Sequence, residues 1–107
     1  MFISYNLRSF ALASYIMLWN WTDQGIRNAK DSPRRYESFK KDLEKAGVKL
    51  VAGYYTMGEY DGVIILEAPN DEVVMKMILS TASLGNIRTK TLKALPHAEA
   101  AKIIESL

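Results

Sequence analysis

Four runs of apolar or alternating residues, without helical spacing, constrain the fold of this chain more than any other feature. They contain many branched and aromatic side chains and are bounded by Gly, Pro, Asn or Asp, which is typical of β-strands. The predicted strands are residues 14–21, 48–57, 62–68 and 86–95. Segment 58–61, between the second and third strands, contains one glycine and predicts a hairpin.

A helix is predicted between the first and second strands. Ser32 and Pro33 supply a capping hydroxyl and a first-turn proline, and Gly47 supplies a left-handed stop. The apolar face of this helix consists of Tyr36, Phe39, Leu43 and Ala46. Ahead of it, Thr22 is suited to cap a shorter helical turn that ends near Lys30.

A second helix is predicted between the third and fourth strands. Asn70 is a suitable cap, acidic residues occupy the first turn, and Gly85 ends the segment. Its buried face consists of Val73, Val74, Met77, Ile78 and Ala82. A terminal helix follows Pro96, with Ala100, Ile103, Ile104 and Leu107 as its apolar residues.

The resulting order is strand, helix, strand, strand, helix, strand. This βαββαβ order predicts an α+β, ferredoxin-like sandwich with an added C-terminal helix. In that fold the first and third strands are central and the second and fourth are at the edges. We expect one domain over residues 13–107, with residues 1–12 as an N-terminal extension.

The first strand is apolar on both of its faces. Ile16 and Leu18 point one way, and Tyr15, Met17, Trp19 and Trp21 point the other. The second strand follows the same pattern, with Leu50, Ala52 and Tyr54 opposite Val51, Tyr55 and Met57. Two helices cover only one face of such a sheet, so the other face is expected to stack on a second copy of the chain. We expect Trp19 in that sheet interface.

Composition excludes several classes of protein. A formal charge of +2 is too small for the basic surface of most nucleic-acid-binding domains. The absence of cysteine excludes disulfides and thiolate metal sites and is compatible with the cytoplasm. No window approaches the about eighteen apolar residues that a membrane helix needs, and the first residues lack the basic region of a secretory signal.

Four segments of the chain resemble a known family. Residues 15–18, 22–28, 56–61 and 84–89 are similar to those of GYD domain proteins, and the third contains the Gly-x-Tyr-Asp element. The resemblance covers residues 13–107 and implies a small prokaryotic protein of the dimeric α+β barrel type. It implies no activity, because the function of that family is uncharacterised.

Candidate ligand-binding residues cluster around the hairpin and the end of the first strand. Tyr60 and Asp61 offer a phenol and a carboxylate, although turn geometry also explains Asp61. Asn20 and Arg27 belong to a polar cluster that is suited to bind an anion, although capping accounts for part of that cluster. His97, the only histidine, is expected at the surface, and we expect neither a metal nor a cofactor.

These observations favour a homo-oligomeric domain that binds a small molecule or regulates another process. The predicted pocket has Tyr60, Asp61 and Asn20 at its rim. The alternative is a small cofactor-light enzyme, of the oxygenase or isomerase type, that uses a pocket near the Gly-x-Tyr-Asp element. A purely structural role is a third class, and the catalytic residues of any enzyme are not identified by the sequence.

Overall fold

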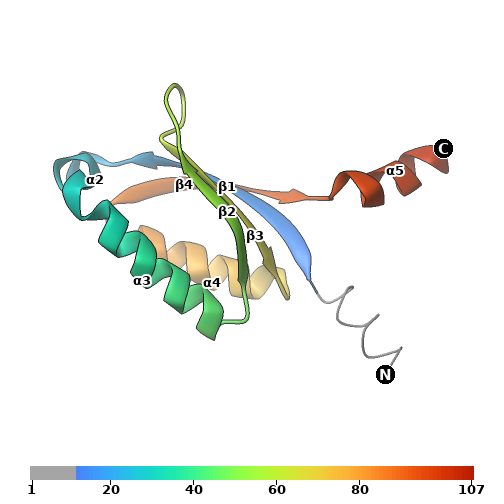
Figure 1. The fold of residues 1–107 in the computed structure, drawn as a ribbon, viewed down its shortest axis with the longest axis horizontal. Helices are drawn as coiled ribbons and strands as arrows, with labels where there is room; N and C mark the ends of the chain where they lie inside the picture. Colours follow the sequence, from blue (N-terminus) through green and yellow to red (C-terminus); the bar gives the residue numbers. More distant parts are fainter. Residues whose placement is uncertain (1–11) are drawn as a thin grey trace.

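The computed structural model describes residues 12–107, which form one sheet with helices on one face. The elements are β1 (Ala13–Trp21), α2 (Asp23–Arg27), η1 (Ala29–Asp31), α3 (Ser32–Lys45), β2 (Lys49–Tyr55), β3 (Gly62–Ala68), α4 (Asp71–Ala82), β4 (Ile87–Ala94) and α5 (His97–Glu105). All neighbouring strands are antiparallel, in the order β2-β3-β1-β4. Helices α3 and α4 lie against one face of the sheet, and no helix of residues 12–107 covers the other face (Figure 1). The predicted ferredoxin-like fold is confirmed; the predicted extension, apart from Leu12, lies outside the described residues.

Two of the predicted helix caps are confirmed. The predicted capping role of Ser32 is wrong, because Ser32 is the first residue of α3, the residue at the cap position is Asp31, and no side chain caps this helix. Thr22 caps α2 by accepting a hydrogen bond from the Gly25 amide at 3.0 Å, and Asn70 caps α4 by accepting one from the Val73 amide at 2.9 Å. Gly47 follows α3 with a φ of 76°, a conformation that side chains with a Cβ atom rarely adopt. These caps fix the points at which the chain returns to the sheet.

The core lies between the sheet and the two helices. Met17 and Trp19 of β1 are 0% and 7% exposed, and they share one cluster with Leu43 of α3 and Val74 of α4. The prediction that Trp19 faces a second copy is therefore wrong. Both faces of β1 are apolar, so alternation could not tell which face the helices cover.

A β-bulge at Val51 changes the register of β2. Leu50 pairs with Leu66, whereas Ala52 pairs with the next residue along β3, Ile65, so Leu50 and Ala52 lie on opposite faces. The prediction that these two residues share a face is wrong because strict alternation does not allow for the extra residue. The bulge turns Tyr55 toward the helix-covered face, where it contributes to the cleft described below.

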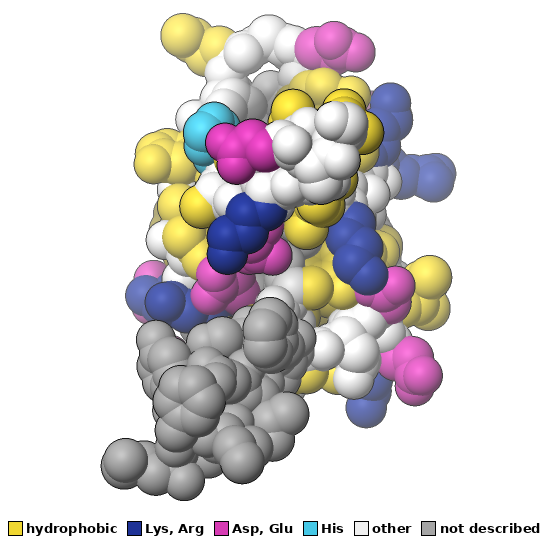
Figure 2. All heavy atoms as spheres, turned by 90° about the vertical axis from the view of Figure 1, so that its right-hand side faces the viewer, with side chains coloured by type: hydrophobic (Ala, Val, Ile, Leu, Met, Phe, Trp, Pro, Cys, Tyr) yellow, Lys and Arg dark blue, Asp and Glu magenta, His cyan; other side chains and the backbone are white. Residues whose placement is uncertain are grey.

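The last helix, α5, stands away from the sheet at one end of the molecule (Figure 1). Ile104 is 63% exposed there, and Ile103 is also exposed. A view from that end shows hydrophobic side chains at the surface between charged ones (Figure 2). Across residues 12–107, no helix is long and apolar enough to cross a membrane.

Candidate functional site

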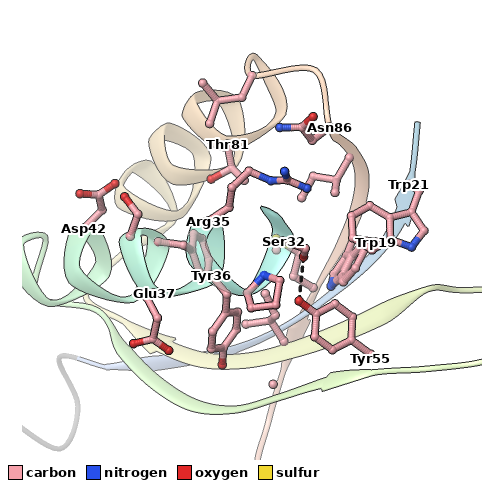
Figure 3. Close-up of a pocket in the computed structure, with 18 of the residues that line it drawn as sticks. Trp19, Trp21, Ser32, Arg35, Tyr36, Glu37, Asp42, Tyr55, Thr81 and Asn86 are labelled. Carbon is pink, nitrogen blue, oxygen red and sulfur yellow. Dashed lines mark hydrogen bonds between the residues drawn. The ribbon is translucent and has the colours of Figure 1, made fainter. Parts of the chain in front are cut away.

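A cleft of about 400 Å³ lies between α3, the end of α4 and the helix-covered face of the sheet. Ligand sites in proteins are usually concave, mostly apolar and of about this size, roughly 300–1,000 Å³. Aromatic side chains from three elements contribute to the wall: Trp19 and Trp21 of β1, Tyr55 of β2, and Tyr36 and Phe39 of α3. Figure 3 shows Trp19, Trp21, Tyr36 and Tyr55 around this space.

The aromatic wall at the β1 end is tightly interlocked. Trp19 and Trp21 are two residues apart and therefore lie on the same face of β1. Their rings meet edge to face, with centroids 4.8 Å apart. Tyr55 meets Trp19 in the same way at 5.8 Å and lies nearly parallel to Trp21 at 6.4 Å. Each ring restricts the others, so the shape of this end is fixed before any ligand arrives.

A glycine allows Trp19 to occupy this position. Gly62 is its partner on β3, and a Cβ atom added at Gly62 would lie 2.1 Å from the indole. The ring therefore lies directly against the backbone of β3. A side chain at position 62 would push Trp19 into the cleft.

Two hydroxyl groups stand beside the aromatic wall. Ser32, which is buried at the start of α3, and Tyr55 share a hydrogen bond of 2.7 Å between their hydroxyl oxygens (Figure 3). This bond ties the first turn of α3 to β2 across the cleft. Each hydroxyl keeps further hydrogen-bonding capacity for a ligand.

Arg35 provides the only basic side chain among the described residues that line the cleft. Its Nη1 donates to the Asn28 carbonyl at 3.1 Å. Its Nη2 is buried and has no hydrogen-bond partner within the described part of the chain. The guanidinium group points toward the Trp21 and Asn86 end, whereas Glu37 and Asp42 lie at the other end (Figure 3). The cleft is thus aromatic, with a cation at one end and acids at the other.

The residues that the sequence suggested as ligand-binding lie at a different place. The Asp61 carboxylate accepts hydrogen bonds from the Trp21 amide at 2.9 Å and from Asn20 Nδ2 at 3.4 Å. Asn20 Nδ2 also donates to the carbonyl of Glu59 at 2.9 Å. The structure thus brings Asn20 and Asp61 together, in contacts that hold the β2–β3 hairpin against the end of β1.

Tyr60 and Arg27 complete that predicted set. The Lys90 ammonium lies 5.6 Å from the centre of the Tyr60 ring, and Arg27 is exposed in the last turn of α2. None of Asn20, Arg27, Tyr60 and Asp61 lines the cleft. A ligand-binding role for these four residues stays a prediction.

His97 and the acidic residues form no metal centre in the described chain. His97 begins α5 and is exposed, the single cyan side chain in Figure 2. Within residues 12–107, no group of three or more His, Cys, Asp or Glu side chains is placed to hold a metal ion. The cleft itself offers aromatic faces, hydroxyl groups, one guanidinium group and the carboxylates of Glu37 and Asp42.

A second polar cluster lies away from the cleft, at the start of α4. The Tyr15 hydroxyl donates to the Asp71 carboxylate, and Lys93 Nζ lies 3.2 Å from the same carboxylate. Burial, followed by the contact with Asp71, raises the pKa of Tyr15 to about 12. The hydrogen bonds from Tyr15 and then from Lys93 lower the pKa of Asp71. None of the three residues lines the cleft, so this cluster anchors α4 to the sheet.

Fold and cleft together define a small ferredoxin-like α+β domain with a ligand-sized space between its helices and its sheet. Residues 15–104 match the GYD domain family, and the chain belongs to that family, as the sequence predicted. One relative, from Thermus thermophilus, is 35% identical over 89 residues, which cover 82% of this chain and 94% of the relative. That relative is named glutamine synthetase and cystathionine beta-lyase binding protein. No solved structure is significantly similar to the chain.

Proposed function

We propose that this protein is a small-molecule-binding domain of a regulatory kind and that its cleft is the binding site. One observation carries the proposal: a buried Arg35 nitrogen, without a hydrogen-bond partner among residues 12–107, belongs to a side chain that lines a partly aromatic cleft of about 400 Å³. A buried polar group without a hydrogen bond destabilises a fold, and a charged group does so more strongly. A ligand that pairs with this group would offset that cost.

The two tryptophans of the chain allow a direct test. Both line the cleft, so their two indole N–H signals in a protein NMR spectrum report on its occupation. We expect a screen of small organic fragments to yield compounds that shift both signals. In the variant Thr81→Phe, which places a larger side chain in the cleft wall, the same compounds should bind at least tenfold more weakly. A screen in which no compound shifts either indole signal would contradict the proposal.

The bare face of the sheet supports a second part of the proposal, a homo-oligomer. Ile16, Leu18, Val63 and Ile65 line up there across β1 and β3 without a helix over them. Leu92 of β4 extends this surface and is 53% exposed. An apolar surface of this kind is typical of an interface, and two such sheets stack about 10 Å apart.

Light scattering tests the oligomer. We expect a mass of at least twice the 12.1 kDa of one chain, and we expect Ile16→Asp to give the mass of one chain. Met75→Glu is the matched control, because Met75 is an exposed apolar residue of α4 rather than of the bare sheet face. A wild-type mass near 12.1 kDa would refute this part of the proposal.

A protein partner is the second candidate function. The Thermus relative is named for binding two enzymes, and the hairpin of this chain carries Met57, which is 99% exposed. Size-exclusion chromatography with purified glutamine synthetase tests this candidate, with Met57→Asp as the comparison. Co-elution of wild type that Met57→Asp abolishes would support it, and separate elution of wild type would contradict it.

The absence of cysteine supports the proposal that the protein works in the cytoplasm.

A further inference from the structure

We infer that the cleft takes a small aromatic monocarboxylate, whose carboxylate group pairs with Arg35. This inference rests on the proposed small-molecule function and specifies the class of the ligand. Three properties of the cleft carry it: the Arg35 nitrogen that has no partner among residues 12–107, the opposite charges at the two ends of the cleft, and the aromatic wall.

The first property is the state of Arg35. Its guanidinium group is always charged in a protein. The ion pairs of the described residues are Lys49–Glu67 and Lys93–Asp71, so no acid in that part of the chain neutralises Arg35. Nη1 is held by the Asn28 carbonyl, whereas the buried Nη2 has no hydrogen-bond partner among residues 12–107. A carboxylate is the group that a guanidinium fork binds best, together with phosphate.

The position of Arg35 along the helix supports a functional reason for the charge. Arg35 lies in the first turn of α3, where the helix dipole favours acids; that turn contains no acid, and the acid at the cap position before it, Asp31, makes no capping hydrogen bond. An arginine there destabilises the helix slightly when it stands alone. When a ligand carboxylate pairs with Arg35, a negative group lies near the N-terminal end of α3, and the helix dipole favours a negative group there.

The second property is the distribution of charge, which limits the ligand to one negative group. Arg35 is the only basic residue of the described lining, and Glu37 and Asp42 lie at the opposite end (Figure 3). A second carboxylate on the ligand would approach these acids and lose binding energy by repulsion. A phosphate, with nearly two charges, would meet only one cation. The lining therefore selects a single carboxylate.

The third property is the aromatic wall, which selects the body of the ligand. Trp19, Trp21 and Tyr55 present rings in two nearly perpendicular orientations, and aromatic ligands gain from both face and edge contacts.

The Asn86 amide oxygen accepts a hydrogen bond from Gln24 at 3.0 Å. Its amide NH₂ group donates to no residue of the described chain and is therefore available to a ligand. A body of one or two rings suits a cleft of about 400 Å³.

Three related probes test the class of the ligand: 1-naphthylacetate, its neutral amide 1-naphthylacetamide, and naphthalene-1,5-diacetate, which carries a second carboxylate on the far ring. Titration followed by the two indole signals gives the affinity of each. On wild type we expect 1-naphthylacetate to bind at least tenfold more tightly than the amide, because one charge-assisted pair is worth about that factor. We expect it to bind more tightly than the diacetate as well, because the second carboxylate would lie near Glu37 and Asp42. This comparison needs no variant, so it is independent of any effect of mutation on folding.

Two neighbouring arginines supply a matched pair of variants. Arg35→Gln should weaken 1-naphthylacetate at least tenfold and leave 1-naphthylacetamide unchanged. Arg34→Gln should change neither, because Arg34 is exposed on the same turn and does not line the cleft.

The possible failures are distinguishable. Equal binding of acid and amide in the cleft, or unchanged binding of the acid by Arg35→Gln, would overturn the inference and leave the proposed function standing. If neutral fragments from the screen occupy the cleft and 1-naphthylacetate does not, the inference is likewise overturned and the proposed function stands. If no compound of any kind shifts the indole signals, the proposed function itself fails.

Discussion

A methyl group added at Gly62 tests how the structure holds Trp19 in the wall of the cleft. The new Cβ atom would lie 2.1 Å from the Trp19 indole, and an ordinary contact begins at 3.4 Å, so the ring must move by about 1 Å. Overpacking of this kind costs about 1–3 kcal/mol. The φ angle of Gly62 is not positive, so Ala suits the backbone and restores about 0.4–1 kcal/mol through the unfolded state. We expect a net loss of about 1–2 kcal/mol in the free energy of unfolding.

Urea unfolding followed by tryptophan fluorescence measures this loss, and a second background identifies its cause. In Trp19→Leu the indole is absent, so Gly62→Ala should be neutral there or stabilise by up to about 1 kcal/mol. Gly53→Ala is a comparison, because its Cβ atom would meet the outer end of the Tyr36 side chain, 2.5 Å from the hydroxyl oxygen and 3.2 Å from two ring carbons, rather than an indole. An equal loss in both Trp19 backgrounds, or no loss in wild type, would refute the packing argument.

Two other predictions concern the polar clusters outside the cleft. The pKa of Tyr15 is about 12 in the fold against an ordinary 10.0, so the unfolded chain releases this proton first and the free energy of unfolding should fall as the pH rises between these values. Tyr15→Phe should flatten that fall in urea titrations, and an unchanged slope would contradict the raised pKa of Tyr15. Asp61→Asn should lower the melting temperature by replacing a charged acceptor, while Tyr60→Phe should cost at most about 1 kcal/mol. If either substitution lowers the affinity of a ligand that binds in the cleft, the conclusion that the hairpin lies outside the binding site is wrong.

The fold was predictable because several independent signals agree. Periodicity located α3 and α4, and the caps Thr22 and Asn70 act as the sequence indicated. The central position of β1 and β3 follows from the βαββαβ order. Here local preference and global topology point to one answer, which is what a foldable sequence requires.

The faces of the strands were harder to predict. Both faces of β1 are apolar, so only the packing of α3 and α4 decides that Trp19 is inside and Ile16 outside. The bulge at Val51 left no local signal that alternation could detect, and it turned Tyr55 to the helix-covered face. Such features depend on contacts between distant segments rather than on the residues nearby.

A pocket between the sheet and the helices was predicted, but the residues that line the cleft were missed for a similar reason. Its wall combines side chains from β1, β2, α3 and the end of α4, which no single motif contains. One signal was nevertheless present: two arginines, Arg34 and Arg35, in the first turn of a helix that has no acid there. A residue that breaks a local rule in this way is a reason to look for a ligand. The Gly-x-Tyr-Asp element drew attention instead, and the structure shows Asp61 holding the hairpin to β1.

A crystal structure of the protein grown with 1-naphthylacetate tests the central claim most directly. The account predicts the carboxylate within hydrogen-bonding distance of Arg35 Nη2 and the rings against Trp19 and Trp21. Rings bound on the bare face of the sheet, or a cleft closed by its own side chains with Nη2 paired to the protein, would contradict it.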